Sequence, residues 1–447
     1  HNKITQRILH ARIITNRTAK LGASSMKDTF RLGIIFTHPT QHHAPLWRKL
    51  NEQPGISVSA LYLSAENQVG GDRQLGSSQA WDVDLVSGYQ FEYLKTITGK
   101  ISPKVKKSLL NPGLLTRLTR ENFDAVWLSN FNTYSYRLAF LLCKLRGIPI
   151  LSQNDATIIT DDRYNYGRRV LLSILYPWMF QLSDYWIPIG DHNVTYLRHY
   201  GVADEKMVRG CYPFDRERFE QTIDQNYTEI ERIRQQLRWD NNTIVFGFAG
   251  KYIDRKNPFE FIEGIAKAHQ KNPQIRGVTI GGGELANAID KRLATMNGEV
   301  LNLGFINQSQ LPLYYAAMDG FVSTSYTDPH PLVISEAMAA GCPVILSDRC
   351  GNWGYSDIVQ HRHNGLVYPC GNSDALAEAM LTLADPSVRK AYSQNAKEIV
   401  AKQDLNCTLD AVMEIIARIK QQKIAANNRD RIPSALLIDR SIQQQQY

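Results

Sequence analysis

Short apolar runs alternate with amphipathic stretches along most of the chain, which is the pattern of strands and helices in an α/β protein. In the first half, strands are predicted at residues 31–37, 56–63, 124–129, 148–152 and 184–190, and helices at residues 44–51 and 134–146. Residues 64–90 are rich in Gly, Ser and Gln and predict a long surface excursion. Because strands and helices alternate, we expect a parallel, doubly wound sheet.

A second series of the same kind follows a charged, mostly helical segment at residues 213–241. Its predicted strands are residues 244–249, 277–280, 300–303, 320–325 and 343–347, and its predicted helices are residues 258–271, 309–318, 331–340 and 374–384. Two Rossmann-like, doubly wound domains with a cleft between them are therefore predicted.

The predicted domain borders follow from these two series. We expect an N-terminal domain at residues 30–215 and a C-terminal domain at residues 216–404, with a helix at about residues 405–423 packing back on the first domain. Residues 1–29 are basic and predict a poorly ordered leader or an over-long gene start, with a membrane-surface helix as the alternative. Residues 424–447 predict a polar, disordered tail.

Composition narrows the partners and the compartment. Of the 447 residues, 43% are hydrophobic and 21% are charged, as in a soluble globular protein, and the formal net charge of +8 favours acidic partners such as nucleotides or anionic lipid. Six cysteines without a C-x-x-C pair favour a reducing compartment. No apolar run approaches the roughly 18 to 20 residues that span a bilayer, so a cytoplasmic protein is predicted.

Residues suited to binding a sugar nucleotide gather around the predicted helix at residues 331–340. Asp328 lies in the loop before this helix and Glu336 in its first turns, and the helix N-terminus between them suits a phosphate group. Carboxylates beside a phosphate would repel it unless they bind hydroxyl groups of the same ligand, so the combination indicates a sugar nucleotide. Lys251 and Lys256 follow another strand, at the end where doubly wound sheets bind ligands. Taken singly, these features are also compatible with helix capping and ordinary surface charge.

In this order the features resemble the family-4 retaining glycosyltransferases of GT-B fold, over about residues 240–385. The segments that match the family are Lys251 with Lys256, the glycine-rich turn at residues 281–284, Gly304-Phe305, the Ser-x-x-Glu-x7-Glu pattern from Ser325 through Asp328 to Glu336, the helix sequence SEAMAAGCPVI, and NGLV at residues 364–367. Asp328 stands where the family has its first Glu, so the carboxylate is kept but is shorter by one methylene.

The resemblance implies a donor site for a nucleotide diphosphate-sugar, with no metal and no further cofactor. Glu336 would hold the ribose hydroxyls, and Asp328 would contact the transferred sugar. The implied donor-binding residues are Gly250, Lys251, Lys256, Gly282, Gly283, Phe305, Asp328, His330, Pro331, Leu332 and Glu336. The implied catalytic residues are Asp328, Lys251, Lys256 and Asp155.

The N-terminal half resembles the family more loosely. Many members carry a His after the fifth strand, and this position corresponds to Asn154, which cannot act as an acid or a base. Asp155 is the nearest substitute. The expected acceptor-facing residues are His38, Gln41, His42 and Asn154, and a zinc site on the histidines at 38, 42 and 43 is the weaker alternative.

The sequence thus predicts a metal-independent, retaining glycosyltransferase that moves a sugar to a sugar or lipid-linked acceptor in bacterial polysaccharide, lipopolysaccharide or glycolipid assembly. Basic and aromatic residues at 164–169 precede an apolar segment, residues 170–180, and suggest a peripheral contact with anionic membrane at its inner face, with a core helix as the alternative. Nucleic acid is not an expected partner. A nucleotide-sugar 2-epimerase of the same fold and a non-catalytic scaffold are the alternative functions.

Overall fold

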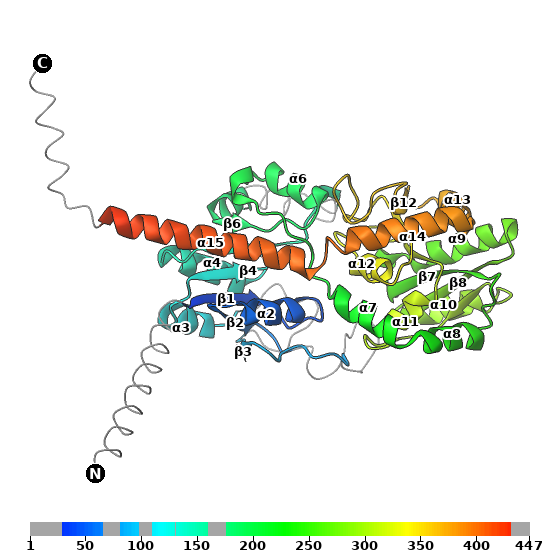
Figure 1. Ribbon diagram of the computed structural model, residues 1–447, viewed down its shortest axis with the longest axis horizontal. Coiled ribbons are helices and arrows are strands. Elements are labelled where there is room, and N and C mark those ends of the chain that lie inside the picture. The colour runs from blue at the N-terminus through cyan, green and yellow to red at the C-terminus, as the bar shows by residue number, and fades with distance from the viewer. Residues whose placement is uncertain (1–28, 66–80, 98–109, 130, 160–175, 431–447) are drawn as a thin grey trace, which may run out of the picture.

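The computed structural model describes residues 29–65, 81–97, 110–129, 131–159 and 176–430. Two bodies lie side by side in Figure 1. The N-terminal one runs from blue to green and also carries the orange-red last helix, and the C-terminal one runs from green to orange. Residues 1–28 of the predicted leader, the basic stretch at 164–169 and residues 431–447 of the predicted tail lie outside the described residues. Among the helices of the described ranges, none combines the length and the apolarity of a membrane span.

The first sheet is parallel, in the order β3-β2-β1-β4-β5-β6. Its strands are β1 (Phe30–Phe36), β2 (Ile56–Tyr62), β3 (Gln90–Tyr93), β4 (Ala125–Leu128), β5 (Ile150–Ser152) and β6 (Tyr185–Trp186). Because side chains alternate along a strand, Leu32 and Ile34 of β1 pack against α2 (His43–Glu52), while Ile35 faces α3 (Gly113–Arg120), α4 (Tyr134–Leu145) and α6 (Asp191–His199). Apolar residues on both faces explain why helices cover both sides.

The second sheet is also parallel, in the order β12-β11-β10-β7-β8-β9. Its strands are β7 (Ile244–Lys251), β8 (Ile275–Gly282), β9 (Val300–Asn302), β10 (Gly320–Ser323), β11 (Val344–Ser347) and β12 (Gly365–Tyr368). One face packs against α9 (Pro258–Lys271), α10 (Ala286–Leu293) and α13 (Ser373–Ala384). The other packs against α7 (Arg216–Gln225), α8 (Tyr227–Gln236), α11 (Leu311–Ala316), α12 (Leu332–Ala339) and α14 (Pro386–Val400). The two doubly wound sheets confirm the predicted fold class.

The chain crosses between the two bodies twice, before α7 and again between α14 and α15 (Leu405–Asp430). The crossings run side by side, because the Leu405 amide donates to the Phe214 carbonyl (3.1 Å) and the Cys211 amide donates to Thr408 Oγ1 (3.0 Å). Apolar side chains of α15, including Val412 and Ile415, are buried in the core of the first sheet. The last helix therefore helps to hold the N-terminal body together.

Several elements differ from the sequence prediction, and the strand predicted at residues 184–190 is limited to Tyr185–Trp186. The surface excursion predicted at residues 64–90 is wrong at its end, because Gln90 already belongs to β3, which pairs with the edge of β2. The prediction of a disordered tail is wrong over residues 424–430, where α15 continues as a helix. A polar composition does not prevent this, because the packed first turns of α15 have already nucleated the helix, and adding further residues to its solvated end costs little.

Candidate active site

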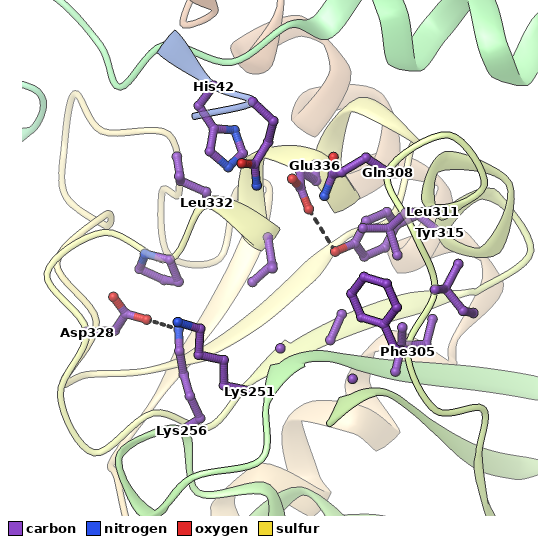
Figure 2. A pocket seen from close by; sticks show the side chains of 18 of the residues that line it. His42, Lys251, Lys256, Phe305, Gln308, Leu311, Tyr315, Asp328, Leu332 and Glu336 are labelled. Carbon is purple, nitrogen blue, oxygen red and sulfur yellow. Dashed lines mark hydrogen bonds and ion pairs between the residues drawn. The ribbon is translucent and has the colours of Figure 1, made fainter. Parts of the chain in front are cut away.

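A cavity of about 340 Å³ lies between the two bodies, at the carboxyl ends of β7 and β10. The C-terminal body supplies most of its lining, and Gln41, His42 and Trp81 come from the N-terminal body. Figure 2 shows the ion pair of Lys256 with Asp328 on one side of this cavity and the hydrogen bond between Tyr315 and Glu336 on the other. Ligands of doubly wound domains bind at this end of the strands.

Three cations form one corner of the cavity. Lys251 ends β7, and Arg255 and Lys256 follow in a short 3-10 turn (Asp254–Lys256). Asp328, only 5% exposed, is paired with Lys256, and its Oδ1 lies 3.6 Å from Arg255 Nη1. Burial by itself raises the pKa of Asp328, but the charges of Lys256 and Arg255 outweigh it and hold this pKa below its ordinary value. Asp328 is therefore ionised, and it is paired with two of the three cations, Arg255 and Lys256.

The helix that carries Glu336 begins at the cavity. Pro331 is the extended N-cap of α12 rather than its first helical residue (φ −68°, ψ 102°), and Gly341 follows the helix with φ +86°, as expected for a helix end. Among the residues that the structure describes, no side chain caps the N-terminus of α12, and this helix end lies where Leu332 lines the cavity.

Glu336 is a buried carboxylate, 3% exposed, on the cavity wall. It accepts a hydrogen bond of 3.0 Å from the Tyr315 hydroxyl. Burial raises the pKa of Glu336, against the lowering effects of Tyr315 and the charge of Arg218. A carboxylate offers about four acceptor positions, so Glu336 can accept further hydrogen bonds from ligand hydroxyls.

The other end of the cavity is apolar. Phe305 follows β9, and Leu311 lies on the same side of the cavity in Figure 2. The apolar side chains of Ile280 and Ile306 also line the cavity. Gly281 completes this wall, and a Cβ there would collide with the carbonyl oxygen of the neighbouring strand, so only glycine fits. Aromatic and aliphatic surface of this kind suits the flat face of a nucleobase.

The predicted glycine pair lies elsewhere. Gly282 is the last residue of β8, where its carbonyl accepts from the Tyr252 amide, and Gly283 opens the turn into α10. Neither residue lines the cavity, and Gly281, one position earlier, takes this place. The reason is the strand register, which brings Gly281 opposite Gly250 at the end of the sheet.

Neutral aromatic and imidazole rings meet where the two bodies join. Tyr212 stacks on His330 with ring centroids 5.3 Å apart and also contacts His42 and His43. Burial lowers the pKa of His330 to about 4, and burial together with the charge of Arg218 lowers the pKa of His42 to about 3. Both imidazoles are therefore uncharged near pH 7. His330 lines the donor cavity, and its buried Nδ1 has no hydrogen-bond partner within the described part of the chain.

A second cavity of about 190 Å³ lies in the N-terminal body, beyond Tyr212. It brings together His38, Asn154 and Asp155, from the loops after β1 and β5. The Oδ1 of Asn154 accepts from Asn193 Nδ2 (3.0 Å) and from the amide two residues on, so this side chain holds its own loop in shape. The expected acceptor residues are thus divided, with Gln41 and His42 in the main cavity and the others here.

The sequence contains one Asp-x-Asp triplet, Asp82-Val83-Asp84, the spacing of a common metal-binding motif. Its two carboxylates have different protein partners, because Asp82 accepts from Ser309 and Asp84 pairs with Arg48 (3.2 Å). His43 forms a hydrogen bond between its Nδ1 and the hydroxyl oxygen of Thr40 (3.0 Å). Within the described ranges, no three His, Cys, Asp or Glu side chains are grouped to hold a metal ion.

Several lining residues were missed by the sequence prediction. Arg255 stands beside Lys256 in one basic pair, so its charge was a usable signal. Tyr315, Gln308 and Trp81 carry no local signal, because they reach the cavity from elements far apart in the chain.

Comparisons with known proteins agree with this geometry. Residues 229–399 match the family model for glycosyl transferases group 1. An Escherichia coli UDP-Gal:alpha-D-GlcNAc-diphosphoundecaprenol alpha-1,3-galactosyltransferase is 29% identical over 161 residues, which cover 35% of this chain and 40% of that protein. A Campylobacter jejuni GalNAc-alpha-(1->4)-GalNAc-alpha-(1->3)-diNAcBac-PP-undecaprenol alpha-1,4-N-acetyl-D-galactosaminyltransferase is 22% identical over 344 residues, or 76% of this chain and 86% of that protein.

The fold is also found in a solved structure. HepE from Anabaena, in complex with UDP and glucose, has a TM-score of 0.63 at 18% identity, covering 87% of this chain and 99% of that chain. This likeness confirms the GT-B fold. The chain spans 40 to 48% of the length of the first curated relatives it matches. The family model itself matches within the C-terminal body.

Proposed function

We propose that this chain, whose family match and fold support a group 1 glycosyltransferase, transfers a sugar from a nucleotide diphosphate-sugar to an acceptor hydroxyl. One observation carries the proposal. A single cavity brings together a cationic corner at Lys251 and Lys256, a buried carboxylate at Glu336 and an apolar wall at Phe305. These three surfaces match the diphosphate, the ribose hydroxyls and the base of such a donor.

The cationic corner would do the electrostatic part of the reaction. Lys251, Arg255 and Lys256 stabilise negative charge that grows on the departing diphosphate. Asp328 positions two of these cations through its ion pairs. We propose that this charge replaces a divalent metal, so that activity survives EDTA and does not rise when magnesium is added.

Retention at the anomeric carbon is part of the same proposal. The bond from the sugar carbon to the diphosphate oxygen breaks, the bond to the acceptor oxygen forms on the same face, and the acceptor proton passes to the departing phosphate. Such a transfer requires no protein base, which suits a site where Asn154 stands in place of a His and the lowered pKa values of His42 and His330 make both imidazoles weak bases. Anomeric proton signals of the product would report the configuration directly.

The N-terminal cavity at His38 and Asp155 is the proposed place of the acceptor, since it adjoins the donor cavity through Tyr212. The E. coli and C. jejuni relatives are named for substrates linked to undecaprenol, which supports a lipid-linked acceptor in polysaccharide, lipopolysaccharide or glycolipid assembly.

A lipid-linked acceptor would require contact with a membrane. Exposed apolar side chains lie near one another on the N-terminal body: Leu141 and Leu145, one helical turn apart on α4, and Trp178, whose ring contacts Phe140. We propose that these three side chains rest on an anionic membrane surface. Flotation with liposomes of phosphatidylglycerol should carry the wild-type chain upward and leave a variant with serine at all three positions behind. Equal flotation of the two would exclude this surface.

Donor binding is the first test of the function. UDP-, GDP- and ADP-sugars are added separately to the full chain and thermal unfolding is followed, because a ligand that binds only the native state raises the melting temperature. We expect one nucleotide class to stabilise the wild type, Lys251→Ala to lose this shift, and Lys271→Ala, which removes a surface ammonium paired with Glu378, to keep it. The proposal is wrong if no donor stabilises the protein.

Turnover separates the enzyme from its alternatives. Slow donor hydrolysis without an acceptor would show a working transferase site. An epimerised donor as product would indicate the 2-epimerase instead, and binding without any turnover, with or without acceptors, would indicate a scaffold.

A further inference from the structure

A short loop of the N-terminal body reaches across to the donor cavity. Residues 81–89 are held on their own body by Arg48, which donates from Nε to the Ser87 carbonyl (3.1 Å) and pairs with Asp84. Asn51 Nδ2 also donates to the Gly88 carbonyl (3.0 Å). The loop is therefore attached to α2 and carries its first residues toward the other body.

Asp82 attaches the same loop to the C-terminal body. Its carboxylate accepts two hydrogen bonds from Ser309, from the hydroxyl to Oδ2 (2.5 Å) and from the amide to Oδ1 (3.1 Å). The Asp82 amide lies 3.4 Å from Asn307 Oδ1. These contacts join segments 225 residues or more apart and bridge the mouth of the cleft.

Trp81, the neighbour of Asp82, lines the donor cavity at its apolar end. Its ring centroid lies 6.0 Å from that of Phe305, with the ring planes 52° apart. Phe305 and Leu311 lie on the side of the cavity away from Asp328, as Figure 2 shows. A ligand whose diphosphate occupies the cationic corner would therefore present its base to these two rings.

We propose that Trp81 is a nucleobase-binding residue supplied to the donor site by the N-terminal body, and that Asp82 positions it through Ser309. The inference rests on the proposed function, since it concerns the base of the same nucleotide. Its consequence is that the nucleotide is held by both bodies: Phe305 belongs to one and Trp81 to the other. Binding of the base then favours the arrangement in which Asp82 and Ser309 are in contact.

The test compares nucleotides with a ligand that lacks a base. Isothermal titration measures the binding of UDP, GDP, ADP and inorganic pyrophosphate to the full chain and its variants. Losing one aromatic contact with a base costs roughly 5- to 150-fold in affinity. We expect Trp81→Ala to weaken the preferred nucleoside diphosphate by about 10-fold or more and to change pyrophosphate binding less than about twofold, while Trp81→Phe keeps most of the nucleotide affinity.

Asp82 is tested as a positioning residue. Asp82→Ala should weaken the nucleotide by a few-fold to about 10-fold, again without a matching change for pyrophosphate, and Asp82→Asn should recover part of the loss because its amide oxygen still accepts from Ser309. Ser309→Ala in the Asp82→Ala background should add little, as expected for two partners of one contact. Tyr227→Ala removes an exposed aromatic residue of α8, outside the cavity lining, and serves as the matched control.

The outcomes separate this inference from the function it rests on. Nucleotide binding by the wild type with an unchanged affinity in folded Trp81→Ala overturns the role of Trp81 and leaves the proposed donor site in place. Equal losses for nucleotide and pyrophosphate also overturn it, because the effect would then be on the whole cleft. If the wild type binds pyrophosphate but no nucleotide, the proposed function and this inference both fail. Should Trp81→Ala not fold, Trp81→Phe and the Asp82 variants decide by the same comparison.

Discussion

Replacing Glu336 by glutamine should change activity and stability in opposite directions. Glutamine has nearly the same shape, and its amide oxygen can still accept the hydrogen bond from the Tyr315 hydroxyl. The variant loses the negative charge that would accept hydrogen bonds from ribose hydroxyls. A hydrogen bond to a charged group contributes about 1.5 to 3 kcal/mol, so kcat/KM for the donor should fall roughly 10- to 150-fold.

The stability of the Glu336→Gln protein should increase relative to the wild type at neutral pH, while its activity falls. Glu336 is almost fully buried, and burial raises its pKa above the ordinary value of 4.5. When folding raises the pKa of a carboxyl group, the group makes its full stabilising contribution at pH values below its pKa in the unfolded chain. This contribution is lost as the pH rises through the pKa in the folded protein, because the buried group must then carry a charge. Glutamine has no charge to bury. The melting temperature of the variant, relative to the wild type, should therefore increase from pH 4 to pH 7.5.

The assay pairs donor kinetics with thermal unfolding at the two pH values. Tyr315→Phe is the informative companion, because it removes the hydrogen bond that the Tyr315 hydroxyl donates to the carboxylate and should lower the melting temperature at pH 7.5. A Glu336→Gln protein with normal kcat/KM would exclude the ribose-binding role. A variant that loses stability relative to the wild type as the pH rises would show instead that the charge of this carboxylate stabilises the fold.

Three further changes test other parts of the structure. Asp328→Asn should lower the free energy of unfolding by about 3 kcal/mol, because it leaves the largely buried ammonium of Lys256 without its partner. Denaturant titration measures this loss, and a value below about 1 kcal/mol would mean that the ion pair is solvated. Gly281→Ala should cost roughly 1 to 3 kcal/mol and weaken nucleotide binding, because the new Cβ meets the carbonyl of Gly250 at a φ of +146°, and unchanged stability would contradict the tight strand register. Asp357 has its pKa raised to about 6 by burial, so its stabilising contribution is present below pH 3.8 and lost as the pH rises through about 6. The free energy of unfolding of Asp357→Asn, relative to the wild type, should therefore rise by about 2 to 3 kcal/mol between pH 3.5 and pH 7.5. The same difference between the two proteins at both pH values would refute this.

Sequence alone was sufficient for the parts that depend on neighbours along the chain. The alternation of apolar strands and amphipathic helices fixed two parallel sheets, since helices must cover both faces of each sheet. The same logic located Lys256 and Glu336, because residues just after parallel strands, and at the start of the next helix, share one edge of the sheet. The confirmed fold and this shared edge follow from local periodicity.

Only the tertiary structure decided which residues meet across the cleft. The pairing of Tyr315 with Glu336, the stack of Tyr212 on His330, and the approach of Trp81 to Phe305 join segments far apart in the sequence. No local pattern encodes these contacts, because they depend on strand register and on how the two bodies pack. Asp328 shows the difference in one residue. Its sequence position marks a carboxylate beside a phosphate site, and only the folded chain surrounds it with the cations that keep it charged.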